Sequence, residues 1–305
     1  LGYVAVNCVS AYSVSQNVKS VTVLAERVPL YFPIRANRFL AKFGLVAVGE
    51  DKLSLDGHVG SFHYPLNPLT YGKGTDLSVL AIDSLRSDVV DEKTMPNLTK
   101  FKERSASFTD HYSAGNATRA GVFGLFYGLP PFYWHSALST NIPAAMVTGF
   151  QKAGYDITAF TTATLMRPEF YATVFSSVRP IRMSSDQGNG VAERDLDSVN
   201  DFEAWLQTLD ANKKFFSFMF LDSVHALDFP SDLKVPYEDY WKEVDRLELG
   251  PDFNPKQFFN RYKNSAYWQD VLIGRVIQTL EKAGRLDNTV VIVTSDHGEE
   301  FNDSK

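Results

Sequence analysis

The sequence predicts an α/β fold in which a mostly parallel sheet is flanked by helices on both faces. Two observations lead to this prediction. Short, nearly all-apolar runs occupy residues 77–82, 215–221 and 289–294, and such runs are typical of strands buried on both faces. Segments with helical patterns separate these runs, and strands that alternate with helices of ten residues or more indicate a parallel sheet.

The expected elements follow one another in chain order from residue 76 onward. Strands are expected at 77–82, 155–161, 215–221 and 289–294, and helices at 95–105, 122–127, 142–153, 199–209 and 258–283. Gly154 and Gly284 directly follow two of these helices, and glycine is favoured just beyond the end of a helix.

Residues 1–75 differ from the part that follows. They contain two segments with helical patterns and then a turn-rich stretch at 49–74. We expect them to form a connecting arm that packs on an α/β catalytic domain formed by residues 76–305. The sequence begins with Leu1 rather than Met and ends at Lys305, a few residues after its most informative motif. We therefore expect a piece of a longer polypeptide, in which the α/β domain continues beyond its present C-terminus.

Composition excludes several classes of protein. The 44% hydrophobic and 22% charged residues are ordinary for a globular chain and exclude a disordered one. Thirty Lys and Arg against 36 Asp and Glu give a net charge of −6, which argues against a nucleic-acid-binding protein. The single cysteine, Cys8, excludes an intrachain disulfide and a cysteine-rich metal site. No apolar run reaches the roughly 18–20 residues that cross a bilayer.

Polar side chains directly follow the three apolar runs. Asp83 follows the first run, His225 lies shortly after the second, and Asp296 and His297 lie shortly after the third. Ligands of a parallel sheet collect beyond the carboxyl ends of its strands, so we expect these side chains to share one crevice. Carboxylate, imidazole and hydroxyl groups together suit a divalent cation such as Mn, Mg or Zn. Taken singly, each residue is equally explained as a helix cap or a turn residue.

A small, polar segment at residues 113–121 leads into the expected helix at 122–127. A hydroxyl at a helix N-terminus lies among free N–H groups that favour an anion. A nearby metal would make Thr118 a candidate nucleophile. The alternative interpretation is that Thr118 or Asn116 only caps the helix.

These motifs, in this order, resemble the alkaline phosphatase/sulfatase superfamily. The resemblance covers residues 76–305 and is carried by five features: Asp83, the segment Met95-Pro-Asn-Leu98, the turn at 116–121, His225 and the run Thr294-Ser-Asp-His-Gly-Glu299. The resemblance implies a metal held by Asp83, Asp296, His297 and the hydroxyl of Thr118, with Thr118 as the nucleophile. It also implies that His225 contacts the phosphoryl group of the substrate. We expect Arg119 and Asn116 to bind the substrate as well, although Arg119 is equally explained as a salt-bridged surface residue.

Two details of the turn bear on activity. The turn contains neither the cysteine nor the proline of the motif that sulfatases convert to formylglycine, so sulfate-ester hydrolysis is disfavoured. The threonine of threonine-type relatives aligns with either Thr118 or Ala117, and the sequence leaves this choice open.

Within the superfamily, the chain resembles membrane-anchored members, the YejM/PbgA-type inner-membrane proteins. Residues 28–39 and 115–128 carry this similarity. It implies a multi-helix membrane anchor before the arm, absent from this sequence, and a domain on the periplasmic side of a bacterial inner membrane. The expected activity is that of a metal-dependent hydrolase or transferase of phosphate esters or anionic lipid headgroups. The alternative is a weakly catalytic domain that binds lipid or protein and regulates outer-membrane lipid homeostasis, through lipopolysaccharide or cardiolipin.

Overall fold

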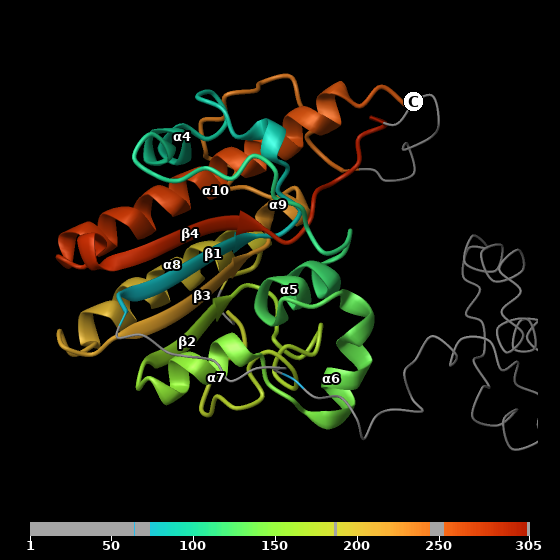
Figure 1. The fold of residues 1–305 in the computed structure, drawn as a ribbon. Coiled ribbons are helices and arrows are strands. Elements are labelled where there is room, and N and C mark those ends of the chain that lie inside the picture. The colour runs from blue at the N-terminus through green and yellow to red at the C-terminus, as the bar shows by residue number, and fades with distance from the viewer. Residues whose placement is uncertain (1–63, 65–73, 186–187, 245–252, 304–305) are drawn as a thin grey trace, which may run out of the picture. The chain divides into compact units, whose positions relative to one another are not determined.

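The centre of the fold is a parallel sheet, formed among the described residues by four strands in the order β2-β3-β1-β4 (Figure 1). The strands are β1 (Asp76–Ile82), β2 (Asp156–Thr161), β3 (Phe215–Leu221) and β4 (Thr289–Ser295). All four lie where the sequence predicted strands: β1, β3 and β4 at the three apolar runs, and β2 at the expected strand of residues 155–161. The parallel sheet and its helices confirm the predicted fold class.

The computed structural model describes residue 64 and residues 74–185, 188–244 and 253–303. All of them belong to one compact unit, residues 63–305. The predicted arm at 1–75 lies almost entirely outside the described residues and stays a prediction. In the described part of the chain, no helix combines the length and the apolar character that a membrane span needs.

The register of the sheet aligns the carboxyl ends of three neighbouring strands. Ile82 of β1 pairs with Leu221 of β3 on one side and with Ser295 of β4 on the other. The next residue of each strand is an aspartate: Asp222, Asp83 and Asp296, in the order β3, β1, β4. The sheet therefore places three carboxylate-bearing residues side by side at one edge.

The expected helices are all present, but several begin or end at other residues than expected. They are α4 (Pro96–Lys102), α5 (Thr118–Tyr127), α6 (Trp134–Thr140), α7 (Ala145–Lys152), α8 (Val191–Thr208), α9 (Ser223–Ala226) and α10 (Lys256–Lys282). Short 3-10 turns lie at Ser87–Val89, Pro131–Tyr133 and Leu286–Asn288. The sequence did not predict α6, and α8 begins at Val191 rather than at residue 199.

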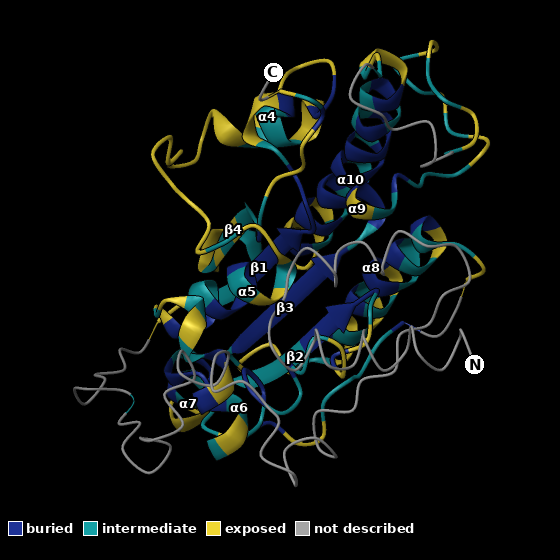
Figure 2. Cartoon of the chain, turned by 90° about the vertical axis from the view of Figure 1, so that its right-hand side faces the viewer, coloured by how far each residue is buried: buried dark blue, intermediate teal, exposed yellow. Residues whose placement is uncertain are grey.

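Helices cover both faces of the sheet, as Figure 1 and the burial pattern in Figure 2 show. On one face, α8 and α10 pack on strand residues such as Leu80 and Met219. On the other face, Phe126 of α5 and Phe150 of α7 contact the rings of Phe218 and Phe216. The central strand β3 is consequently buried along its whole length.

Strand β4 differs from the expectation of a strand buried on both faces. Val291 and Val293 pack against the hydrophobic core, but Val290 and Ile292 are 50% and 40% exposed. The cause is its place at the edge of the described sheet, where α5 and α7 do not extend over it. The expectation that this apolar run is buried on both faces was therefore wrong, because only one face of β4 is covered.

Candidate active site

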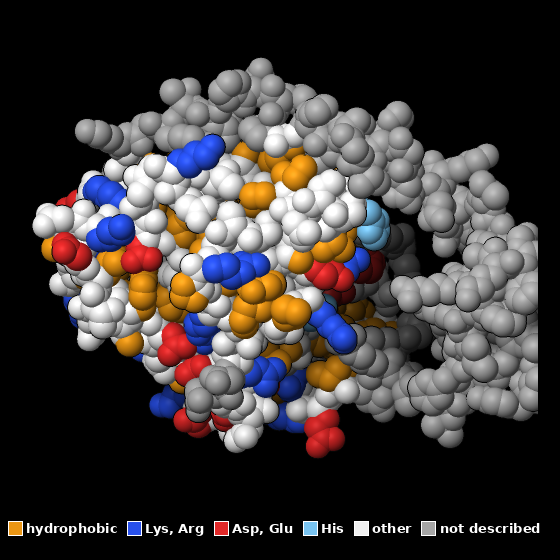
Figure 3. All heavy atoms as spheres, turned by 90° about the horizontal axis from the view of Figure 1, so that it is seen from below, with side chains coloured by type: hydrophobic (Ala, Val, Ile, Leu, Met, Phe, Trp, Pro, Cys, Tyr) orange, Lys and Arg blue, Asp and Glu red, His pale blue; other side chains and the backbone are white. Residues whose placement is uncertain are grey.

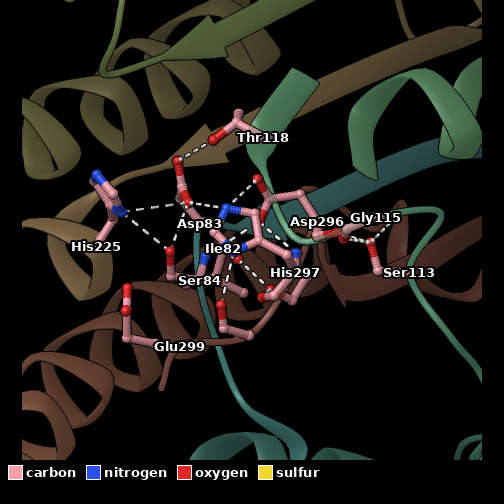
Figure 4. A network of polar contacts seen from close by, with 12 residues as sticks. Ile82, Asp83, Ser84, Ser113, Gly115, Thr118, His225, Asp296, His297 and Glu299 are labelled. Carbon is pink, nitrogen blue, oxygen red and sulfur yellow. Dashed lines mark hydrogen bonds and ion pairs between the residues drawn. The ribbon is translucent and has the colours of Figure 1, made fainter. Parts of the chain in front are cut away.

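Asp83, Asp296 and His297 form a cluster at the carboxyl edge of the sheet (Figure 4). Each offers one possible metal-ligand atom, and these atoms all lie within 4.8 Å of one another. His297 Nε2 lies 3.4 Å from Asp83 Oδ1 and 3.5 Å from Asp296 Oδ2. Both aspartates are almost completely buried. The structure thus brings together three of the four predicted metal ligands.

The other ring nitrogen of His297 defines what Nε2 offers to the cluster. His297 Nδ1 lies 2.7 Å from the carbonyl oxygen of Gly298. A carbonyl oxygen only accepts hydrogen bonds, so Nδ1 carries a proton, and a neutral ring in this orientation has its lone pair at Nε2. Nε2 faces the two carboxylates, so the ring in its neutral form can offer this lone pair to a cation beside the carboxylate oxygens.

The electrostatic surroundings of Asp296 also favour a bound cation. Burial, and then the charge of the neighbouring Asp83, raise the pKa of the Asp296 carboxyl above its usual range. Asp296 Oδ1 accepts hydrogen bonds from the backbone N–H groups of Ser84 and His297, whereas the buried Oδ2 atom has no hydrogen-bond partner. A buried carboxylate oxygen without a hydrogen-bond donor suits a metal ligand, so the cluster fits a divalent cation.

Thr118, the fourth predicted ligand, is the first residue of α5. Its hydroxyl donates a hydrogen bond to Asp83 Oδ2 over 3.2 Å. The residue before the helix is Ala117, and no side chain caps this end of α5. Neither Thr118 nor Asn116 is thus a capping residue. The first N–H groups of α5 stay available to an anion beside the Thr118 hydroxyl.

Gly121 sets how closely α5 approaches the end of β4. A Cβ atom on Gly121 would lie 2.0 Å from the backbone oxygen of Asp296, far inside van der Waals contact. The hydroxyl of Ser113 donates a hydrogen bond to the same oxygen. The small residues of the 113–121 segment therefore serve to bring the N-terminus of α5 against Asp296.

His225 lies in the short helix α9, which follows β3. Its Nδ1 atom lies 3.1 Å from the hydroxyl oxygen of Ser84 and 3.9 Å from Asp83 Oδ1. The His225 side chain is 51% exposed. Figure 4 shows the ring on the side of Asp83 opposite to Ser113 and Gly115. His225 is thus the predicted substrate-binding residue that the structure joins to the metal-ligand cluster.

Among the described residues, the other two predicted substrate-binding residues form no hydrogen bond or ion pair with the cluster. Arg119 forms a 2.9 Å ion pair with Glu169, and its guanidinium lies over the ring of Trp134. Asn116 is exposed to solvent. For Arg119, these contacts agree with the alternative of a salt-bridged surface side chain, and its role toward a substrate stays a prediction.

Three residues of the site were not predicted as site residues. Ser84 contacts Asp83, His225 and Asp296, and Tyr262 of α10 holds the backbone of Ser84. The carboxyl of Asp222 stands next to Asp83, and its burial, with the charges of Asp83 and Asp195, raises the pKa of Asp222 to about 8. Asp222 directly follows a predicted strand and Ser84 is the second residue after one, so strand-end position was a usable signal. Tyr262 gave no such signal.

Charges are mixed elsewhere on the surface. On the face shown in Figure 3, basic side chains are interspersed with acidic and hydrophobic ones over the described residues. This face carries no extended basic surface for nucleic acid, in agreement with the net charge of −6.

Comparison with known proteins gives three findings. The family model described as Sulfatase matches residues 48–305. The inner membrane protein YejM of Salmonella typhimurium is 29% identical over 306 residues, which cover 98% of this chain and 47% of that protein, and YejM of Salmonella typhi has the same identity and coverage. The chain thus spans about half the length of these relatives.

Solved structures share the fold. An alkaline phosphatase superfamily protein of Vibrio parahaemolyticus matches 82% of this chain and 64% of its own, with a TM-score of 0.54 and 18% identity. A phosphonate monoester hydrolase of Agrobacterium radiobacter matches 74% of this chain and 63% of its own, with a TM-score of 0.52 and 15% identity.

Proposed function

The chain belongs to the sulfatase family, and from that premise we propose that it is a metal-dependent hydrolase or transferase of phosphate esters with Thr118 as its nucleophile. The observation that carries the proposal is the contact of the Thr118 hydroxyl, over 3.2 Å, with Asp83 of the Asp83–Asp296–His297 cluster. A threonine that only began a helix would not need a buried carboxylate as its partner. Asp83, Asp296, His297 and Thr118 would hold the cation.

The reaction divides into two displacements at phosphorus. In the first, Thr118 Oγ1 forms a bond to phosphorus while the bond from phosphorus to the leaving oxygen breaks. The threonine proton passes to Asp83 Oδ2, which already accepts it as a hydrogen bond. In the second, a water or an acceptor hydroxyl attacks phosphorus and gives up a proton, which balances the proton that the leaving oxygen took up from the solvent in the first displacement. The bond to Thr118 breaks, and Asp83 returns the proton to the threonine oxygen.

Each neighbouring group has a task in these displacements. A bound divalent cation would lower the pKa of the Thr118 hydroxyl and would place a positive charge near the phosphoryl oxygens. The uncapped N-terminus of α5 offers N–H groups to those oxygens. His225 lies beside Asp83, where its exposed ring edge reaches the phosphoryl group or the leaving oxygen.

We further propose that the domain acts at the periplasmic face of a bacterial inner membrane on an anionic phosphate-containing substrate such as a lipid headgroup. The support is the similarity to YejM, which is an inner membrane protein by name. The regulatory alternative from the sequence predicts weak turnover or none, so the experiment below separates the two.

The test is hydrolysis of an aryl phosphate after chelation, with Mn, Mg or Zn added back one at a time. We expect metal-restored turnover in the wild-type protein and a loss of more than about 1,000-fold in Thr118→Ala, because the nucleophile is gone. Thr118→Ser is the matched control, since it keeps a hydroxyl at the same position and should keep measurable turnover.

Two results would contradict the proposal. Undiminished turnover of Thr118→Ala would exclude this nucleophile. A protein that binds metal at the cluster but hydrolyses no phosphate ester would support the regulatory alternative instead.

A further inference from the structure

Ser84 has an unusual backbone for a residue that is not glycine. Its φ angle is 63°, in the left-handed region that favours glycine, and the residue is completely buried. A side chain retained in this conformation points to a function of its hydroxyl group.

The Ser84 hydroxyl joins two site residues. Its oxygen lies 2.9 Å from Asp83 Oδ1 and 3.1 Å from His225 Nδ1 (Figure 4). An ionised carboxylate only accepts hydrogen bonds, so the hydroxyl donates its single proton to Asp83. The remaining lone pairs of the oxygen can only accept, and the proton between Ser84 and His225 must therefore belong to His225 Nδ1.

We propose that Ser84 is a positioning residue that holds His225 in the Nδ1–H tautomer, with Nε2 directed toward the substrate. Figure 4 shows the second ring nitrogen of His225 pointing away from Ser84, and half of this side chain is exposed. Nε2 accepts a proton while the ring is neutral and donates one when the ring is charged.

The backbone N–H and carbonyl groups of Ser84 are also hydrogen-bonded. Its backbone N–H donates to Asp296 Oδ1 over 3.1 Å. Its carbonyl oxygen accepts from the hydroxyl of Tyr262, which also accepts the N–H of Arg86, each over 2.8 Å. The turn is thus held from α10 independently of the Ser84 side chain, which leaves the hydroxyl free for the Asp83–His225 connection.

The chemical task of His225 rests on the proposed function, but the tautomer does not. The experiment therefore has one measurement with turnover and one without. Ser84→Gly and Ser84→Ala both remove the hydroxyl, and glycine also relieves the left-handed backbone. A residue needed only for the turn would be replaced by glycine without loss.

The first measurement is aryl phosphate turnover with the restoring metal. We expect Ser84→Gly and Ser84→Ala to lose about 10- to 100-fold in kcat/KM, as for other partners that orient a ligand or catalytic ring. In a His225→Gln background, the further loss from Ser84→Gly should be less than about twofold, because the ring it positions is absent. Wild-type turnover in Ser84→Gly would overturn the inference.

The second measurement is ring ¹H–¹⁵N correlation of the ¹⁵N-histidine-labelled protein, well above the ordinary imidazole pKa of about 6.5. The signal missing from His225→Gln identifies this ring. We expect the Nδ1–H pattern in the wild-type protein and its loss in Ser84→Gly. An Nε2–H ring in the wild type, or an unchanged Nδ1–H ring in Ser84→Gly, would overturn the inference. A wild-type protein without turnover that still shows the Ser84-dependent Nδ1–H ring would contradict the proposed function and support this inference.

Discussion

Strand β1 begins at one buried aspartate and is followed by another, and their surroundings are opposite. Asp76, at the amino end, is held by Arg285 Nη2 at 2.9 Å and Nε at 3.1 Å, and by the N–H of Phe215. Asp83, at the carboxyl end, lies between Asp222 and Asp296 in the strand order. Within the described residues, no lysine or arginine forms an ion pair with these three carboxylates.

The two ends of one sheet thus treat buried carboxylates differently. At the amino end, a guanidinium compensates the buried charge, so that carboxylate contributes to a stable fold. At the carboxyl end, burial and mutual repulsion raise the pKa values of Asp222 and Asp296, which means that the charged state is unfavourable there. The protein tolerates this electrostatic strain where a cation can relieve it.

The largest expected effect comes from breaking the compensated end. Arg285→Ala leaves Asp76 buried without its cation and should lower the free energy of unfolding by about 3–5 kcal/mol. Urea unfolding followed by circular dichroism measures this loss. Lys256→Ala removes an exposed ion pair with Asp239 and is the matched control, for which little change is expected. Equal losses of unfolding free energy in the two variants would show that the buried Asp76–Arg285 pair stabilises the fold no more than an exposed ion pair does.

The next effect concerns the pH dependence at the crowded end. The pKa of Asp222 is raised to about 8 in the folded protein against about 3.8 in the unfolded chain, so the folded state binds the proton more tightly. Stability from this group is fully present below pH 4 and is lost as the pH rises toward 8.

Asp222→Asn removes this dependence. In metal-free buffer, the variant should gain stability over the wild-type protein by about 1–3 kcal/mol near pH 8, and the gain should shrink toward pH 5. Urea unfolding at several pH values measures the difference. A gain that is the same at every pH would contradict the assigned cause.

The sequence predicted the carboxyl edge well for a physical reason. Parallel strands end at one edge, so polar residues after apolar runs had to come together there, and Asp83, Asp296 and His297 do so. The register, which places Asp222 beside Asp83, became visible only in the sheet. The same holds for the pairing of Asp76 with Arg285, which are 209 residues apart.

Other features depended on tertiary contacts that no local pattern contains. The left-handed Ser84 is held by Tyr262, 178 residues later in the sequence. Helix α6 was missed, although Trp134 and Ala137 are buried in it. The uncovered face of β4 was missed because the apolar composition of a strand does not show which helices pack against it.

Metal binding tests most directly the claim that the crowded strand ends hold a cation. The measurement is the rise in the unfolding midpoint when Mn, Mg or Zn is added to chelated protein, with calorimetric titration for stoichiometry. We expect one of these cations to bind at one site per chain and raise the midpoint in the wild type and in Asp239→Asn, but not in Asp296→Asn. The same rise in Asp296→Asn, or no rise in the wild type with any of the three cations, would contradict the account.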